Sequence, residues 1–464
     1  MSTDDLCYLT INEAASLIRD GKLSPVELTE AHIERIDRLD PKVNAYVTRL
    51  DEGAMADARA AESEIRGGRY RGPLHGIPVS FKDLYDTAGT RTTGQSKVFA
   101  ERVPTQDSAT VARMKEAGAV SLGKVALAEF GLGGSPTSLF ETPSNPWNLN
   151  YSPGGSSSGS GAALAAGLCM GSFGTDTGGS LRNPGHCSGI VGLKPTMGRV
   201  SRFGVIPCSW SLDTVGPMAR TVGDVASLLQ IVAGHDPNDP TSAHVPVPDY
   251  AATLGDGIAG MRIGIPRDYF FNTELGADTE VIERAERAIA VLQELGASLE
   301  EVSIPSVQDA RSSHMVIMHA EAFAYHREFL RDHAEDYGPV RLRFWLGALY
   351  TAEDYLQASL FRQRMVREVD EILEHVDVIV TPTMPRPAPS GGASSPFGTL
   401  MGLNFLAPFN LTGSPAVSVP CGFTAAGLPV GLQVAGRRFD EATVLRVANA
   451  YADATAWKGM HPSL

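Results

Sequence analysis

Residues 152–196 are SPGGSSSGSGAALAAGLCMGSFGTDTGGSLRNPGHCSGIVGLKPT, two short loops rich in serine and glycine that an apolar segment joins. Glycine lets the backbone adopt positive φ and approach a ligand closely. Serine supplies a hydroxyl that can attack an electrophile or relay a proton. The single imidazole of this stretch, His186, follows the second loop, so we expect a base other than histidine. A lysine is the candidate, and the segment GIPVSFKD places one at Lys82.

The second loop, GTDTGGS (Gly174–Ser180), has the pattern of a turn that presents a nucleophile. We expect the apolar run before it to end a strand, and two glycines then bring Ser180 into a tight turn. Four successive backbone N–H groups would form a nest suited to a developing oxyanion: those of Thr177, Gly178, Gly179 and Ser180. This arrangement favours acyl transfer.

The first loop, GGSSSGSG (Gly154–Gly161), taken alone leaves three interpretations open. One is a flexible Gly/Ser segment without chemistry. A phosphate-binding or dinucleotide-binding loop fits poorly, because no lysine follows the glycines and no clear strand precedes them. The third interpretation is a catalytic loop, and the serine-bearing second loop favours it.

The rest of the chain alternates short apolar runs with helical patterns. The N-terminal segment is helical, since Thr10 and Glu13 form a capping box ahead of an amphipathic stretch. The clearest strand candidates are the apolar runs Ile77–Phe81, Arg262–Pro266, Val376–Pro382, Ala416–Pro420 and Val430–Gly436. Apolar strands that alternate with helices predict an α/β fold around a large mixed, mostly parallel central sheet.

The length of 464 residues exceeds the usual size of one domain, so a two-domain arrangement stays open. We prefer a single α/β/α domain over residues 1–464, because strand patterns flank even the Pro/Gly-rich segment 385–398. Within it, we expect an N-terminal helical layer over residues 1–70 and a catalytic core over residues 71–220. Residues 221–464 would supply the remainder of the sheet and the substrate-pocket region.

The net charge of −14, from 53 acidic against 39 basic side chains, predicts that the chain binds neither nucleic acid nor an anionic membrane surface. No apolar run reaches the roughly 18 residues of a transmembrane helix. The acidic start MSTDDLCYLT lacks the layout of a signal peptide. The five cysteines are scattered without a CxxC pair, which indicates neither a metal centre nor a disulfide framework. We therefore expect a cytoplasmic protein without metal or cofactor.

Several motifs point to one family when they are taken together. GIPVSFKD, GGSSSGSGAALAAG and GTDTGGSLRNPGHCSGIVGLKPT occur in this order, ahead of a C-terminal segment over residues 413–455. In this combination the chain resembles the amidase signature family over nearly its whole length. The resemblance implies a single α/β/α domain and a Ser–Ser–Lys triad. Ser180 would be the nucleophile, Ser156 the bridging serine after a cis peptide bond, and Lys82 the base.

Such a triad requires a neutral Lys82, because an ammonium group cannot accept a proton. Burial disfavours the charged form, and Lys82 follows the apolar run IPVSF. Ser156 would pass its proton to Lys82 and take one from Ser180, which attacks the amide carbonyl and forms an acyl-enzyme. We expect Asp176 to orient the oxyanion loop and Arg182 to anchor it by an ion pair.

The resembled family has branches that differ in substrate. GRVSRFG (Gly198–Gly204) looks like the A subunit of glutamyl-tRNA amidotransferase, which releases ammonia from glutamine for a partner subunit. The middle region, residues 318–344, looks like the stand-alone amidases. We expect the latter: a linear carboxylic amide, anilide or carbamate is hydrolysed by the chain alone or as a homodimer. The alternative is the glutamine-hydrolysing A subunit of a tRNA-dependent amidotransferase assembly.

The expected substrate-binding residues are Gly131, Leu132 and Gly133, because the matching loop lines the acyl pocket in members of the resembled family. Ala126 stands at the asparagine position of the common G-K-x-N pattern. Small and apolar residues in this loop indicate room for a bulky or flat apolar group.

Overall fold

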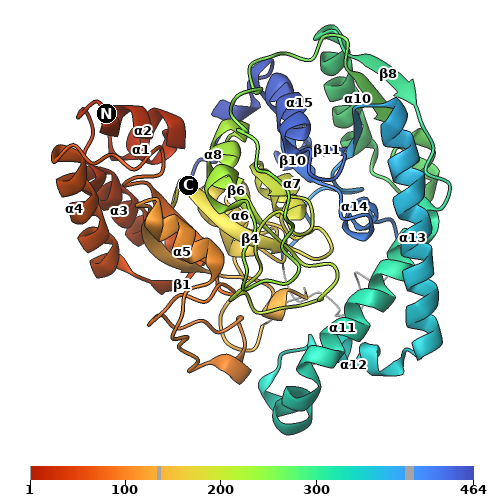
Figure 1. The fold of residues 1–464 in the computed structure, drawn as a ribbon, viewed down its shortest axis with the longest axis horizontal. Helices are drawn as coiled ribbons and strands as arrows, with labels where there is room; N and C mark the ends of the chain where they lie inside the picture. Colours follow the sequence, from red (N-terminus) through yellow and green to blue (C-terminus); the bar gives the residue numbers. More distant parts are fainter. Residues whose placement is uncertain (1, 133–136, 392–401) are drawn as a thin grey trace.

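One continuous β-sheet runs through the computed structural model, which describes residues 2–132, 137–391 and 402–464 (Figure 1). In these residues the sheet has eleven strands, in the spatial order β1-β3-β2-β4-β6-β5-β10-β11-β9-β7-β8. The strands are β1 (Tyr46–Arg49), β2 (Pro78–Lys82), β3 (Val120–Val125), β4 (Gly171–Asp176), β5 (Val191–Lys194), β6 (Thr214–Ala219), β7 (Arg262–Ile265), β8 (Ser298–Glu301), β9 (Val378–Pro382), β10 (Ala416–Phe423) and β11 (Pro429–Gly436). The α/β fold with a large mixed sheet is confirmed.

Strand direction divides the sheet into zones. Parallel pairings lie near its two ends, where β2 pairs with β3 and β4, and β7 pairs with β8 and β9. The middle, from β4 through β6, β5, β10 and β11 to β9, is antiparallel, as is the edge pair β1–β3. The expectation of a mostly parallel sheet is therefore wrong. An apolar strand indicates that both of its faces are covered, but it does not indicate which way its neighbour runs.

Helices cover both faces of the sheet. Phe173 and Val215 pack on one face in the same apolar cluster as α8 (Val222–Val232). Met218 lies three residues after Val215 on β6, so its side chain points to the opposite face. There it packs in the same cluster as α6 (Ser158–Ala165). This arrangement is the expected α/β/α layering.

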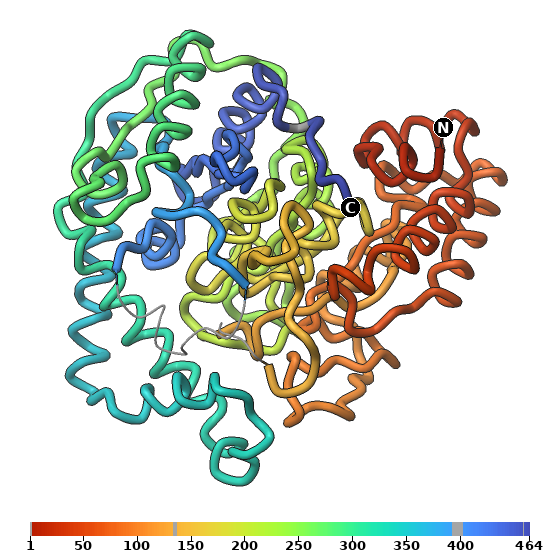
Figure 2. Tube along the Cα trace, turned by 180° about the vertical axis from the view of Figure 1, so that it is seen from behind, coloured from red at the N-terminus to blue at the C-terminus, as the bar shows by residue number. Residues whose placement is uncertain are grey.

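The N-terminal helices form a lobe at the β1 edge of the sheet (Figures 1 and 2). They are α1 (Thr3–Tyr8), α2 (Ile11–Arg19), α3 (Pro25–Val43) and α4 (Asp51–Arg66). The side chains of Thr10 and Glu13 each accept the backbone N–H of the other, so the predicted capping box begins α2. The lobe also contributes β1, an edge strand that the sequence analysis did not foresee.

A helical arm projects at the other end of the molecule (Figure 1). Its long members, α11 (Ala310–His333) and α13 (Ala352–His375), pack side by side, and α12 (Arg341–Leu346) lies between them in the chain. The inner side of α13 buries Met365, Val369 and Leu373 at helical spacing. The remaining helices are α5 (Ala109–Glu116), α7 (Arg182–Ser188), α9 (Arg267–Phe270), α10 (Thr279–Glu294), α14 (Ala407–Leu411) and α15 (Glu441–Asp453).

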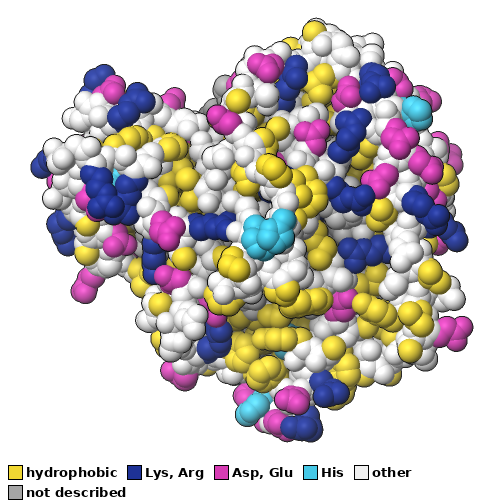
Figure 3. Space-filling model, viewed as in Figure 1, with side chains coloured by type: hydrophobic (Ala, Val, Ile, Leu, Met, Phe, Trp, Pro, Cys, Tyr) yellow, Lys and Arg dark blue, Asp and Glu magenta, His cyan; other side chains and the backbone are white. Residues whose placement is uncertain are grey.

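Charged side chains of both signs are interspersed over the face shown in Figure 3, and hydrophobic side chains gather in its lower middle. Among the helices of the described residues, none combines the length and the apolar character needed to cross a membrane.

Candidate active site

Strand β2 carries Lys82 into the interior of the protein at its C-terminal end. All five residues of β2 are buried, and Lys82 has no exposed surface. Its Nζ lies 2.8 Å from Ser156 Oγ and 2.8 Å from Thr175 Oγ1. Burial lowers the pKa of Lys82 from 10.5 to about 7, although nearby Cys208 and Asp213 oppose this change. About half of the lysine is therefore neutral near pH 7, as a proton acceptor must be.

Two other lysines are as deeply buried, but they bond elsewhere. Lys124 donates to the carbonyl of Tyr85 and to two threonine hydroxyls, and burial lowers its pKa to about 8. Lys194 donates to the carbonyl of Pro195, and burial lowers its pKa to about 7. Of the buried lysines in the described chain, Lys82 alone bonds to a serine of the two loops.

Ser156 lies where the first serine-rich loop approaches α6. The Gly155–Ser156 peptide bond is cis, as the resemblance implied. The carbonyl of Ser156 accepts the N–H of Ala128 at 3.0 Å, and its hydroxyl contacts Lys82. Lys82 and Ser156, 74 residues apart in the sequence, are thus brought into direct contact.

Ser180 lies between the end of β4 and the start of α7, in the strand–turn–helix that the sequence predicted. Gly179 before it has a φ of +116°, and a Cβ at this position would lie 2.1 Å from Leu406 Cδ1, so only glycine fits. Ser180 is 9% exposed, at the border of the interior. Its hydroxyl forms no hydrogen bond with any residue that the structure describes, so a contact between Ser180 and Ser156 stays a prediction.

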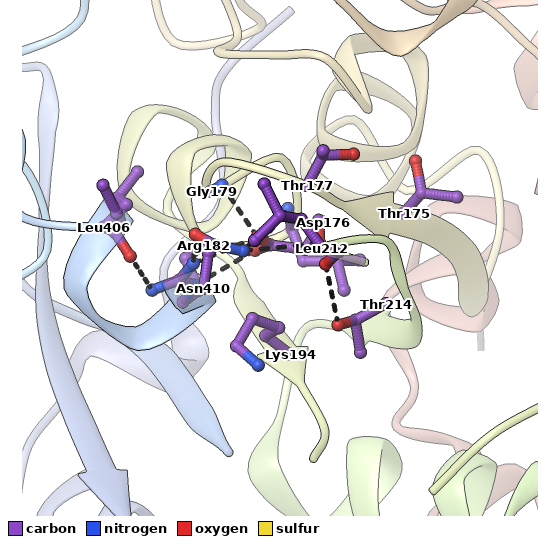
Figure 4. Close-up of polar contacts among 12 residues, drawn as sticks. Thr175, Asp176, Thr177, Gly179, Arg182, Lys194, Leu212, Thr214, Leu406 and Asn410 are labelled. Atoms are coloured by element: carbon purple, nitrogen blue, oxygen red, sulfur yellow. Dashed lines mark hydrogen bonds and ion pairs between the residues drawn. The ribbon is translucent and has the colours of Figure 1, made fainter. Parts of the chain in front are cut away.

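A buried ion pair holds the turn between β4 and α7 (Figure 4). Asp176 accepts the N–H of Gly179 at 2.7 Å and that of Leu181 at 3.2 Å. The Nε and Nη2 atoms of Arg182 lie 3.0 Å from the same carboxylate, and Nη2 also donates to Asn410. Burial alone would raise the pKa of Asp176, but Arg182 holds it well below its usual range. Asp176 and Arg182 therefore hold this turn in the way that the sequence indicated.

The four predicted oxyanion donors differ in what they already bind. The N–H of Gly179 donates to the carboxylate just described. Within the described residues, the N–H groups of Thr177, Gly178 and Ser180 have no protein acceptor. The side chain of Thr177 is fixed separately, because its hydroxyl donates to Asp213 at 2.6 Å. Three of the four predicted donors are thus available to a ligand.

The predicted acyl-pocket loop lies beside Ser156. Gly131 ends a short 3-10 helix (Glu129–Gly131), and a Cβ at this position would lie 3.7 Å from Ser156 Oγ. Leu132 is buried, and its carbonyl accepts a hydrogen bond from Arg343. Gly133 lies outside the described residues. Gly131 and Leu132 are therefore close to the expected reaction centre.

Arg343 of α12 is a site residue that the sequence analysis did not single out. It is 6% exposed, and burial lowers the pKa of its guanidinium. Nη1 donates to Leu132, Nη2 lies 3.4 Å from Nε2 of His319, and Nε has no partner. Within the described chain no carboxylate lies close enough to pair with it. Its neighbours RLRFWL have no signal that distinguishes it from a surface arginine.

Cys208 is buried beside the acyl-pocket loop. A Cβ on Gly131 would be 3.9 Å from the Cβ of Cys208, and burial raises the pKa of the Cys208 thiol, which therefore stays neutral. Over the described residues, no three His, Cys, Asp or Glu side chains lie together as a metal ion would require.

Comparisons with known proteins agree on the family. The family model Amidase matches residues 27–445. The A subunit of the Glutamyl-tRNA(Gln) amidotransferase from Geobacter metallireducens is 43% identical over 481 residues, which cover 98% of each chain. The protein of the same name from a Roseiflexus species is 43% identical over 486 residues, with 99% of each chain covered.

Solved structures resemble the whole fold. A chain from the structure of a vestigial protein complex that reveals the evolutionary origins of an s-triazine catabolic enzyme has a TM-score of 0.89 and 31% identity, over 96% of this chain and 98% of that one. The A subunit of the Glutamyl-tRNA(Gln) amidotransferase from Thermotoga maritima has a TM-score of 0.81 and 35% identity, over 96% of this chain and 94% of that one.

These relatives overturn two expectations. The first is a stand-alone amidase, which rested on the middle region; identities of 40% to 43% over nearly the full length are to amidotransferase A subunits. The second is a small molecule as the only partner, without nucleic acid; these relatives are subunits of an enzyme named for a tRNA. A negative net charge describes the surface of one chain, and it does not exclude an assembly in which other subunits contact RNA.

Proposed function

This chain belongs to the amidase signature family, and from that membership we propose that it is the glutamine-hydrolysing subunit of a tRNA-dependent amidotransferase. In this role it releases ammonia from glutamine, a linear amide, and a partner subunit uses the ammonia. The observation that carries the proposal is 43% identity over 98% of both chains to the A subunit of a Glutamyl-tRNA(Gln) amidotransferase. A relative that matches over nearly the full length of both chains supports a shared role within such an assembly.

The proposed acylation begins at Ser180. Lys82, about half neutral near pH 7, accepts the hydroxyl proton of Ser156 across a distance of 2.8 Å. Ser156 in turn takes the proton of Ser180, whose oxygen attacks the side-chain amide carbon of glutamine. The carbonyl π electrons move to the oxygen, and a tetrahedral intermediate forms.

The N–H groups of Thr177, Gly178 and Ser180 would stabilise the oxyanion of this intermediate, because they have no protein acceptor in the described residues. The C–N bond then breaks, and the proton held by Lys82 returns through Ser156 to the leaving nitrogen. Ammonia departs and leaves a glutamyl ester on Ser180. Water attacks this ester by the same proton route, so that glutamine and water yield glutamate and ammonia.

Arg343 supports glutamine over a neutral amide. A buried guanidinium without a carboxylate partner is costly, and a carboxylate brought by the substrate would relieve that cost. Arg343 bonds to the carbonyl of Leu132, next to Gly131 and the serine that Lys82 contacts. The α-carboxylate of glutamine is a suitable partner, since its side-chain amide could then extend toward Ser180.

The experiment is ammonia release from glutamine. It is measured for the chain alone and with the other amidotransferase subunits and Glu-tRNA(Gln) present. We expect hydrolysis that increases when the partners and the charged tRNA are added. Ser180→Ala should abolish it. Ser188→Ala removes another buried hydroxyl, which donates to the carbonyl of Pro153, and should leave hydrolysis unchanged.

The opposing result is equally clear. If the lone chain hydrolyses aliphatic amides or anilides and no glutamine under either condition, the proposed function is wrong. Glutamine hydrolysis that survives Ser180→Ala would also contradict it.

A further inference from the structure

One side chain of the helical arm contacts the turn Thr177–Ser180, which we call the oxyanion turn. His314, in the second turn of α11, is 3% exposed. Its Nε2 lies 2.8 Å from the carbonyl oxygen of Thr177, a residue 137 positions earlier in the chain. The mechanism described above leaves this histidine without a role, although it touches the turn that should bind the oxyanion.

The chemistry of this contact assigns the proton. A carbonyl oxygen only accepts hydrogen bonds, so Nε2 of His314 must carry the hydrogen. Burial lowers the pKa of His314 to about 4, with Arg182 and Arg343 acting in the same direction and Asp176 and the carbonyl of Thr177 against it. The ring is therefore neutral near pH 7, and its single N–H faces the Thr177 carbonyl.

Peptide geometry converts this contact into an orientation. The peptide between Thr177 and Gly178 is planar, and in a trans peptide the C=O and N–H bonds point to opposite sides. His314 holds the carbonyl from the α11 side, so the N–H of Gly178 points away from α11. That N–H has no acceptor in the described residues, so it is free to donate to an oxyanion.

Packing keeps the peptide from turning over. A Cβ on Gly178 would lie 2.8 Å from Cε1 of His314, so the ring sits directly against this residue. The side chain of Thr177 is held from another direction by Asp213. Gly179 is held by Asp176. The Thr177–Gly178 peptide therefore has its own anchor, and His314 provides it.

We propose that His314 is a positioning residue that holds the Thr177–Gly178 peptide so that the Gly178 N–H is directed at the developing oxyanion. The proposal rests on acyl transfer at Ser180 in the proposed function, but not on glutamine as the substrate. It links the arm to the reaction centre through the backbone of the oxyanion turn. Loss of His314 should slow the attack by Ser180 without weakening substrate binding.

The test uses a fluorophosphonate, which reacts with the serine and places its P=O oxygen in the oxyanion site. The second-order rate constant of labelling at Ser180 is measured for wild type, His314→Leu, His314→Asn and His314→Gln. Removal of a whole oxyanion donor costs roughly 100-fold to 1,000-fold in rate. A misdirected donor retains part of its effect, so we expect about tenfold slower labelling in the leucine and asparagine variants.

The conservative variant and a matched histidine separate positioning from folding. In His314→Gln, the side-chain amide can place an N–H near the position of Nε2, so the rate should recover to within about threefold of wild type. His32 of α3 is also buried and also bonded to a backbone carbonyl, that of Leu28, and burial lowers its pKa to about 4. His32→Leu should label at the wild-type rate even if its melting temperature falls. His314→Asn, which stays polar but is too short to reach Thr177, serves if His314→Leu does not fold.

Two results would overturn the proposal: wild-type labelling rates in folded His314→Leu or His314→Asn, or a His314→Gln variant as slow as the leucine variant. Labelling needs neither glutamine nor other subunits. If His314→Leu is labelled slowly but the wild type has no glutaminase activity, the proposed function is refuted and the positioning role of His314 is kept. Where turnover is measured, kcat should fall about tenfold and KM should stay within about twofold; an unchanged kcat in His314→Leu would refute only the positioning role.

Discussion

Replacing Lys82 by methionine should abolish acylation and at the same time stabilise the fold at neutral and acidic pH. The structure buries Lys82 completely and lowers its pKa from 10.5 to about 7. Below pH 7 the folded protein must carry a buried ammonium, which is unfavourable. Methionine has a similar length and no charge, so it removes this cost together with the base.

The magnitude follows from proton linkage. Between pH 7 and 10.5 the folded state has lost the proton that the unfolded state still binds, so the stability of the wild type rises with pH in this window. The slope is about 1.4 kcal/mol per pH unit, and the whole window amounts to something on the order of 5 kcal/mol. The variant lacks this titration. Its stability relative to wild type should therefore fall by roughly 2 to 3 kcal/mol between pH 6 and pH 9.

The assay is urea unfolding of both proteins at pH 6 and pH 9, with Lys22→Met as the control. Lys22 has 67% of its side chain exposed, so Lys22→Met should differ from wild type by the same stability at pH 6 and at pH 9. A stability difference for Lys82→Met that does not change with pH would refute a buried lysine titrating near pH 7. The matching activity profile is the rate of Ser180 labelling in the wild type, which should rise up to about pH 7 and then level off. A rate that continues to rise toward pH 10 would also refute it.

Other predictions concern the pocket and the turn. In steady-state kinetics, Arg343→Leu should raise the KM for glutamine about tenfold to 100-fold, and its rate of fluorophosphonate labelling should stay unchanged. The control is Arg341→Leu on the exposed side of α12, which should change neither the KM nor the labelling rate. Asp176→Asn breaks a fully buried ion pair and should cost about 3 to 5 kcal/mol in urea unfolding; a cost below about 1 kcal/mol would contradict its anchoring role. Gly179→Ala places a methyl group against Leu406 at a φ of +116° and should cost about 3 kcal/mol. Gly427→Ala, at a φ of +74° with open space around it, should cost about 1 kcal/mol; equal costs would refute the packing argument.

Much of the sheet could be predicted because its inner strands are short apolar runs with clear boundaries. β2, β7, β9, β10 and β11 all lie close to the expected ranges. The edge strand β8 (Ser298–Glu301) was missed because three of its four residues are exposed, so it lacks an apolar pattern. Strand direction was expected wrongly, since it depends on the path of the connections rather than on the strand residues.

The site divides in the same way between local and long-range information. Lys82, Ser156 and Ser180 stand in motifs whose residue order indicates chemistry, and their roles remain predictions of the proposed mechanism. His314 and Arg343 lie on helices of the arm, where nothing in the adjacent residues marks them. They reach the centre only because α11 and α12 pack against the oxyanion turn and the Leu132 loop. The choice of amidotransferase over stand-alone amidase needed the full-length comparison, because the middle region alone pointed the other way.

The central claim is that Ser180 carries a glutamyl group derived from glutamine. The most direct measurement is mass spectrometry of peptides after the complete assembly has been mixed with glutamine and rapidly quenched in acid. We predict a glutamyl ester on the peptide that contains Ser180 in the wild type, and its absence in Ser180→Ala and Lys82→Met. Ammonia release together with a glutamyl group on another residue, such as Cys208, would contradict the account, as would a Ser180→Ala protein that still forms the adduct.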